Sequence, residues 1–137
     1  MGRHEQREQL FKLLFRVEFN SPDDMPEQVK LFFQDDEIQY TEVAMEAIQG
    51  KFAGIQEKLS EIDGMLNEKA EGWNVARMGK VELTVLRIAV YEMIFDEDIP
   101  ETVAINEAIE IAKQYGQSAS GGFVNAVLAK FVNKQEM

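Results

Sequence analysis

The amino-acid sequence predicts an all-α protein of six or seven helices, and three observations lead to this fold class. Every strongly periodic segment repeats its apolar residues at the helical spacing i, i+3, i+4, i+7, and no segment of useful length alternates with the period of a strand. The chain has 137 residues, of which 45% are hydrophobic, so it is long enough to bury a core. It has no cysteine, which excludes disulfides and thiolate metal sites and leaves helix packing to hold the fold.

Three helical stretches are predicted in the first half of the chain. The first covers residues 3–19 and ends at an Asn-Ser-Pro breaker. A short helix follows, with Asp24 as its N-cap. Residues 40–70 are predicted as one long helical stretch, in which Gly50 and Gly54 mark either a kink or a close helix crossing.

The segment 78–95 in the second half is apolar on nearly every side of a helix. A helix that is apolar all round is buried, so this segment predicts a central helix of the fold. Arg87 and Glu92 lie on it, and we expect them either to pair or to lie at its edge, because charged groups are almost never buried alone.

Two further helices are predicted towards the C-terminus. Residues 103–115 are amphipathic, and Gly116 supplies a stop signal. A flexible Ser/Gly connector then leads to the last helix, with Ser120 as its candidate N-cap.

Charge is distributed unevenly along this acidic chain. The net charge is −11, which argues against a general nucleic-acid binder, because phosphate contacts need Lys and Arg. Residues 1–16, however, contain four basic residues and two acidic ones, whereas residues 17–71 contain four basic and fourteen acidic ones. The first helix can therefore offer a local basic patch, since salt screens charges beyond about 10 Å. The alternative is that these charges only solvate a helix face.

Most enzyme and cofactor templates fail on this sequence. The single histidine, His4, lies near a terminus, so neither a catalytic triad nor a di-iron site can be assembled. Zinc ligands, a glycine-rich phosphate loop and a calcium-binding loop are also missing from the sequence. We therefore predict no enzymatic activity, no metal and no cofactor. A helical enzyme built on paired carboxylates stays as a residual alternative, but nothing singles out a pair.

No export signal or membrane span is recognised in the sequence. The N-terminus lacks an apolar region before a cleavage site, and charged residues interrupt the most apolar stretch, residues 81–95. We expect a cytoplasmic protein that does not bind membranes.

Four ordered motifs stand out in the C-terminal half. They are a Trp/Arg lead-in at residues 73–82, LRIAVYEM at 86–93, VAINEAIEIAK at 103–113 and FVNAVL at 123–128. This order resembles the NusB family of transcription antitermination factors. The match covers about residues 73–131, and the number and order of the motifs make the resemblance specific. The segment 20–70 matches mainly in its helical pattern.

The resemblance implies a fold of two packed three-helix subdomains. We assign residues 1–137 to one NusB-like domain, with an N-terminal subdomain over 1–71 and a C-terminal subdomain over 72–137. It also implies a non-enzymatic factor that binds the boxA element of ribosomal RNA leader transcripts together with the ribosomal protein NusE, in the antitermination complex of RNA polymerase. The sequence leaves the oligomeric state open, and a homodimer is one alternative.

The resemblance and the residue chemistry together suggest an RNA-binding set. Arginine forks bind phosphates and aromatic rings stack on unpaired bases. The candidates are Arg3, Arg7, Arg77, Phe123 and Asn125. For Phe123, burial in the core is an equally good interpretation of its position on the apolar stripe.

The family's protein-partner surface corresponds to Phe15 and Glu82. The alternative for Phe15 is a ring in the core, and the alternative for Glu82 is a solvated carboxylate.

Two departures from the family bear on RNA binding. The N-terminal arginine run is thinned to Arg3 and Arg7, and Gly122 replaces a lysine that is frequent in the family. The thinned arginine run, together with the net charge of −11, favours a second hypothesis, a protein-only helical scaffold with weak or no RNA binding.

Overall fold

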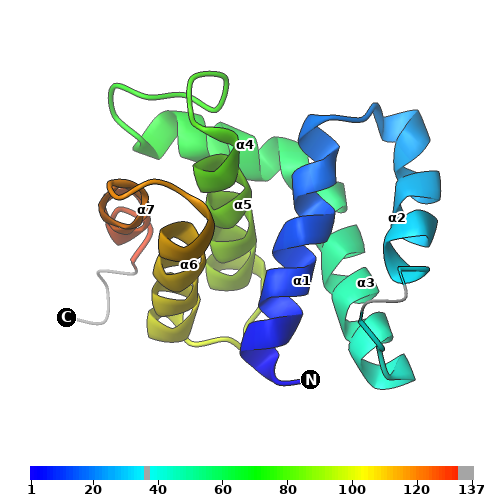
Figure 1. Cartoon of the computed structure of the whole chain (residues 1–137). Helices are drawn as coiled ribbons and strands as arrows, with labels where there is room; N and C mark the ends of the chain where they lie inside the picture. Colours follow the sequence, from blue (N-terminus) through cyan, green and yellow to red (C-terminus); the bar gives the residue numbers. More distant parts are fainter. Residues whose placement is uncertain (36–37, 133–137) are drawn as a thin grey trace. The chain divides into compact units, whose positions relative to one another are not determined.

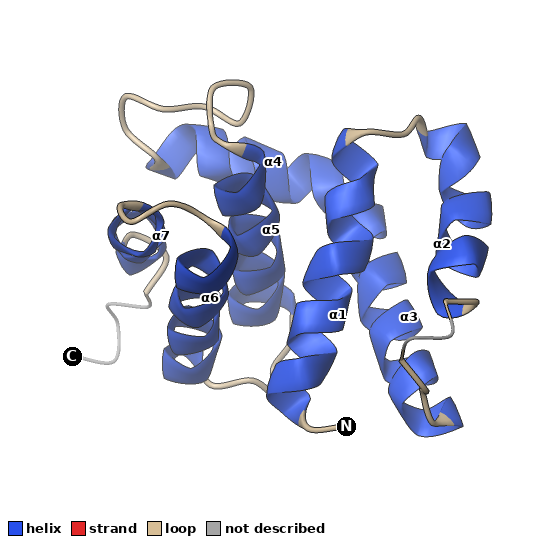
Figure 2. Cartoon of the chain, viewed as in Figure 1, coloured by secondary structure: helices blue, strands red, loops and turns tan. Residues whose placement is uncertain are grey.

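The computed structural model describes residues 1–35 and 38–132 of the chain. Within these ranges the backbone forms seven α-helices and two short 3-10 helices, and every regular element drawn in Figure 2 is a helix. The all-α fold class and the helix number predicted from the sequence are therefore confirmed. None of the helices in the described ranges has both the length and the apolar character that crossing a bilayer requires.

The chain divides into two compact units, residues 1–56 and 57–137. The division expected after residue 71 falls one helix later than this boundary. The difference arises because the helix that follows residue 57 packs on the helix that begins at Lys80, and so groups with the second unit.

The first unit is built from three α-helices and two 3-10 turns (Figure 1). In chain order these are α1 (Arg3–Phe15), η1 (Arg16–Glu18), η2 (Pro22–Asp24), α2 (Met25–Phe33) and α3 (Glu42–Glu57). Leu10, Leu13 and Leu14 on α1 are at most 2% exposed, as the spacing i, i+3, i+4 predicts for the inward face of a helix. At the start of α3, the hydroxyl of Thr41 accepts a hydrogen bond from the amide of Ala44 at 3.1 Å and caps the first turn.

The long helical stretch predicted over residues 40–70 is wrong in its continuity. Helix α3 ends at Glu57, and α4 (Leu59–Lys69) begins after Lys58, whose backbone has φ −100° and ψ 7°. Gly50 and Gly54 both lie inside α3 and mark no break. Open space surrounds the position of a Cβ at Gly50, so no neighbouring helix crosses closely there.

Helix α5 (Lys80–Phe95) is the centre of the second unit. It packs against α4, against α6 (Glu101–Tyr115) and against α7 (Ser120–Ala129), and these last two also pack on each other (Figure 1). All eight residues from Leu83 to Val90 are buried. The prediction of a buried central helix is confirmed.

A buried ion pair accounts for one of the two charges on this helix. The Arg87 guanidinium donates two hydrogen bonds to the Asp63 carboxylate of α4, from Nε to Oδ1 at 2.9 Å and from Nη2 to Oδ2 at 2.8 Å. The Arg87 side chain is 7% exposed and that of Asp63 is 22% exposed. The fork geometry satisfies the arginine in the way that burial of a charge requires, so the expected pairing of Arg87 is confirmed.

Neither Ser120 nor Asp24 caps a helix through its side chain, although the sequence predicted both as N-caps. Ala119, not Ser120, precedes α7, and the Ser120 hydroxyl lies on the first turn, where it accepts a hydrogen bond from the amide of Gln117 at 2.9 Å. Asp24 does precede α2, but it makes no side-chain cap bond and instead accepts a hydrogen bond from the Ser21 hydroxyl at 3.0 Å. In both places, a neighbouring polar group competes for the capping oxygen.

Candidate nucleic-acid interface

Helix α1 carries the two N-terminal arginines of the predicted RNA-binding set in different environments. Arg3 is exposed at the first residue of the helix, where its guanidinium can reach a phosphate. Arg7 is 6% exposed and has a partner within the protein. Arg3 is therefore the better candidate for a direct contact, and burial suits Arg7 to a structural role.

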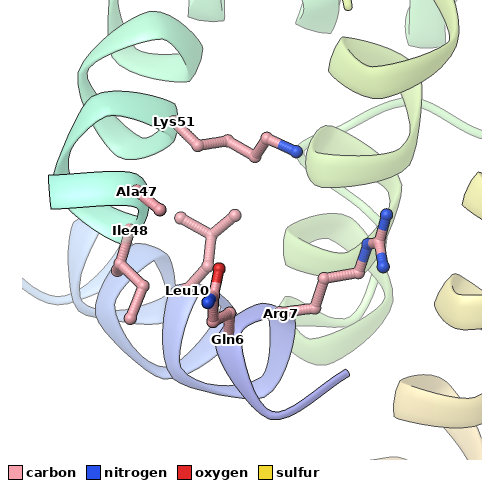
Figure 3. Close-up of a pocket in the computed structure, with 6 residues that line it drawn as sticks. All are labelled: Gln6, Arg7, Leu10, Ala47, Ile48 and Lys51. Atoms are coloured by element: carbon pink, nitrogen blue, oxygen red, sulfur yellow. The ribbon is translucent and has the colours of Figure 1, made fainter. Parts of the chain in front are cut away.

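A small pocket of about 90 Å³ lies between α1 and α3 in the first unit. Figure 3 shows that the stem of Arg7 lines this pocket while its guanidinium extends away from Gln6 and Ile48. Leu10 and Ala47 complete the apolar wall, and Lys51 lies along the rim. The pocket holds the aliphatic part of Arg7, which agrees with packing rather than with presentation of the charge.

Two of the predicted RNA-binding residues, Phe123 and Arg77, both contact Trp73 in the second unit, and we call these three residues the aromatic corner. The rings of Trp73 and Phe123 meet edge to face, with centroids 5.4 Å apart and an interplanar angle of 72°. The Arg77 guanidinium lies 5.9 Å from the centroid of the Trp73 ring. Trp73 is 47% exposed and Phe123 is half-buried, so ring surface remains open to solvent. Aromatic rings beside a guanidinium form the kind of platform on which unpaired bases stack.

The loop between α4 and α5 holds Trp73 and Arg77 in place. Gly72 has φ +79°, a conformation that side chains rarely adopt, and it turns the chain directly before the tryptophan. The amide of Val75 donates to Oδ1 of Asn67 on α4 at 2.9 Å, which ties the loop to that helix. Asn74 accepts a bond from the amide of Arg77 at 3.1 Å through its side chain. The loop is therefore fixed by polar contacts to its own neighbours.

A hollow of about 190 Å³ extends along the aromatic corner between the end of α4 and α7. Trp73, Phe123 and the aliphatic surface of Ala126 form its apolar side. Its rim carries Lys130 and Glu71, whose charged groups pair at 3.6 Å. The hollow can receive a flat ring against the aromatic residues and places a cation beside it.

Asn125 does not belong to this corner. It is exposed on α7, two positions after Phe123, and residues two apart on a helix face different directions. Trp73 was not among the candidates chosen from the sequence, although it is the only tryptophan of the chain and follows a glycine in a loop. Its partial exposure, which comes from the turn at Gly72, could not be predicted from the pattern.

The predicted protein-partner residues lie on different helices. Phe15 is half-buried at the end of α1 and packs between two rings, tilted against Phe11 at a centroid distance of 5.8 Å and edge to face with Phe19 at 5.1 Å. Phe19 is 60% exposed, so this aromatic row ends in solvent. A row of this kind can insert a ring into a partner's apolar surface.

Glu82, the other predicted partner residue, is held within the second unit. Its Oε1 accepts a hydrogen bond from the Ser120 hydroxyl at 2.6 Å. Its Oε2 lies so close to Gly79 that a Cβ at this position would come within 2.4 Å of it. The carboxylate is therefore oriented by its neighbours, and is not the freely solvated group of the alternative interpretation.

Over residues 1–35 and 38–132, no three His, Asp or Glu side chains lie close enough together to hold a metal ion.

Comparison with known proteins agrees with the fold and with these motifs. The family model described as "NusB family" matches residues 4–133. The transcription antitermination protein NusB of Agathobacter rectalis is 47% identical over 131 residues, which cover 96% of this chain and 99% of that protein.

Solved structures are similar over nearly the whole chain. A structure of NusB from T. maritima superposes with a TM-score of 0.85 at 39% identity, covering 95% of this chain and 89% of that one. A crystal structure of the antitermination factors NusB and NusE in complex with double-stranded RNA gives a TM-score of 0.79 at 26% identity, covering 94% and 96%. The chain therefore belongs to the NusB family.

Proposed function

We propose that this protein is a transcription antitermination factor that binds the boxA element of ribosomal RNA leader transcripts together with the ribosomal protein NusE. It acts in the cytoplasm as a component of the RNA polymerase antitermination complex and catalyses no reaction. The observation that carries this proposal is the open corner of Trp73, Phe123 and Arg77 in a chain of the NusB family. The related complex of NusB and NusE with RNA supports the same pair of partners.

The aromatic corner and Arg3 supply the two kinds of contact that RNA binding needs. A base released from its stack lies against Trp73 or Phe123, and Arg77 adds a cation beside the ring. Arg3 binds the backbone phosphates and contributes to affinity without reading the sequence. The net charge of −11 opposes RNA at long range, so we expect a partner protein to be needed for tight binding.

The direct test is to measure binding of a boxA-like RNA and of a scrambled control, with and without NusE, at two salt concentrations. The proposal expects NusE to tighten binding to boxA more than to the control, and higher salt to weaken it. If NusE binds the protein but neither RNA joins the complex, the protein is instead a helical protein-interaction scaffold. The thinned arginine run is the observation that favours this second candidate.

Trp73→Ala is expected to lower the affinity for boxA RNA by about 5- to 150-fold, which corresponds to the roughly 1–3 kcal/mol of stacking on one base. Fluorescence anisotropy of labelled RNA measures this change in the presence of NusE. Trp73→Phe keeps a ring and should recover most of the affinity. Equal losses in both variants would argue against stacking and for a role of the indole N–H.

Arg3→Ala is expected to reduce the slope of log affinity against log salt by about 0.7, the contribution of one phosphate contact to single-stranded RNA. Thermal stability should hardly change, because Arg3 is exposed. Arg7→Ala provides the comparison, since loss of this buried group should lower the melting temperature. An unchanged salt slope in Arg3→Ala would remove Arg3 from the interface.

A further inference from the structure

The hollow along the aromatic corner contains a cation that the predicted RNA-binding set does not include. Lys130 lines this hollow together with Trp73 and Phe123, whereas Arg77 contacts Trp73 but does not line the hollow. Lys130 directly follows α7 and keeps a helical backbone, with φ −77° and ψ −12°. It comes seven positions after Phe123, which places the two side chains on the same face of the helix, about 10 Å apart along its axis. The small side chain of Ala126 lies between them on that face and forms the floor of the hollow.

The ammonium of Lys130 is paired with a carboxylate that water can reach. Its Nζ lies 3.6 Å from Oε2 of Glu71, and the two side chains are 40% and 86% exposed. Within residues 1–35 and 38–132 the structure gives neither side chain a second partner. An exposed pair of two long side chains adds little stability, because water competes for both groups and the side chains lose conformational freedom. The pair can therefore be exchanged for a stronger one at little cost.

The backbone fixes both charged residues at the rim of the hollow. The amide of Glu71 donates to the carbonyl oxygen of Lys69 at 3.1 Å, and the amide of Lys130 donates to that of Val127 at 3.1 Å. Gly72 turns the chain directly after Glu71, with φ +79°. Only the two side chains have to move for the pair to separate. Lys130 can then turn towards a ligand in the hollow, while the Glu71 carboxylate stays in solvent.

We propose that Lys130 exchanges Glu71 for a phosphate of the bound RNA, so that Glu71 acts as a built-in competitor that limits RNA affinity. The inference rests on the proposed RNA-binding function and assigns it a further phosphate contact and an opposing carboxylate. A base against Phe123 occupies the apolar end of the hollow, and its phosphate lies at the charged end. The phosphate displaces the carboxylate because neutralising the RNA backbone releases condensed counterions, whereas the isolated Glu71 carries none to release.

Glu71 also repels RNA phosphates directly, as any carboxylate near the site does. Competition and repulsion differ in how they depend on Lys130. Competition for the ammonium requires the lysine, whereas repulsion acts with or without it. A double-mutant cycle over the two positions therefore separates the two effects.

The cycle uses the full chain with NusE and is measured by fluorescence anisotropy of labelled boxA-like RNA. Glu71→Gln should raise the affinity by about 2- to 5-fold, as expected for release of an exposed pair. Lys130→Gln should reduce the slope of log affinity against log salt by about 0.7, which at about 0.1 M salt is about a fivefold loss of affinity. In the Lys130→Gln background, most of the gain from Glu71→Gln should disappear. Glu68→Gln is the matched control, because it removes an exposed carboxylate of α4 outside the hollow, and it should leave the affinity nearly unchanged.

Two results of the cycle would overturn the inference. An equal gain from Glu71→Gln with and without Lys130 would show that the carboxylate acts by repulsion alone. A wild-type salt slope in Lys130→Gln would show that the lysine contacts no phosphate. If either is found while the wild-type protein prefers boxA to the scrambled control and Trp73→Ala weakens binding, the exchange is wrong and the proposed function stands. If the wild-type protein binds neither RNA, both fail.

Ala126→Leu tests whether the base occupies the hollow itself. The larger side chain fills the floor between Phe123 and Lys130, and should weaken RNA binding by about 5- to 150-fold, the range for loss of one stacked base. Ala129→Leu, which is also exposed on α7 but lies outside the lining, is the matched control and should bind as the wild type does. Neither variant should change the melting temperature much, because both positions are exposed. Equal affinities of the two leucine variants, with Trp73→Ala still weakened, would place the base outside the hollow and overturn this inference alone.

Discussion

Replacing Arg87 with methionine is expected to lower the free energy of unfolding by about 3–5 kcal/mol, because it leaves the Asp63 carboxylate without its buried partner. Both hydrogen bonds of the fork, at 2.8 and 2.9 Å, are lost together. Since the Asp63 side chain is 22% exposed, water can reach it in part, and we expect the lower end of this range. Urea denaturation followed by circular dichroism measures the change.

A double-mutant cycle isolates the contribution of the pair. Asp63→Asn alone leaves a neutral side chain beside the arginine, and Arg87→Met with Asp63→Asn removes both charges. The double variant should be more stable than the sum of the single losses predicts, since no uncompensated charge remains. Additive losses would show that the two side chains do not interact energetically.

Leu86→Ala is expected to lower the free energy of unfolding by about 2–5 kcal/mol, because it opens a cavity at the centre of the second unit. Leu86 is fully buried on α5, the helix against which α4, α6 and α7 pack. The surrounding side chains come from several helices, so the site can collapse only in part. The same denaturation experiment gives the value.

Leu31→Ala on α2 is the matched control for this change, because the chemistry is identical but the side chain is 46% exposed. Its effect should stay within about 0.5 kcal/mol, the usual range for a surface position. A loss at Leu86 no larger than the loss at Leu31 would mean that α5 does not form the core.

The pattern of apolar residues along each helix was sufficient to predict which helical surfaces are buried. The all-round apolar character of residues 78–95 correctly indicated the buried helix α5, and the spacing of Leu10, Leu13 and Leu14 indicated the buried face of α1. Periodicity could not show the break at Lys58, because the apolar stripe continues across it and no breaker residue marks it. The glycines that suggested a kink are accommodated within α3.

The candidate site was predicted less completely, because its geometry depends on contacts between residues far apart in sequence. The family motifs pointed to Arg77 and Phe123 but not to Trp73, the ring that lies between them. Ser120 was expected to cap a helix, whereas its hydroxyl donates to Glu82, 38 positions earlier in the chain. Arg7 shares a helix face with Arg3, but only the structure reveals that Arg7 is buried. The RNA-binding and partner assignments themselves stay predictions.

Gly116 was expected to stop α6 and does follow its last residue, but its φ of −100° is open to any residue. What only glycine provides there is space. A Cβ would come within 2.5 Å of Oγ of Ser120 and within 2.7 Å of the carbonyl oxygen of Ala112. Gly79 leaves room for the Glu82 carboxylate in the same way. Alanine at Gly79 would thus displace the Glu82 carboxylate directly, and alanine at Gly116 would displace Ser120, which donates a hydrogen bond to that carboxylate. A loss of partner binding in either variant would therefore be an effect on Glu82.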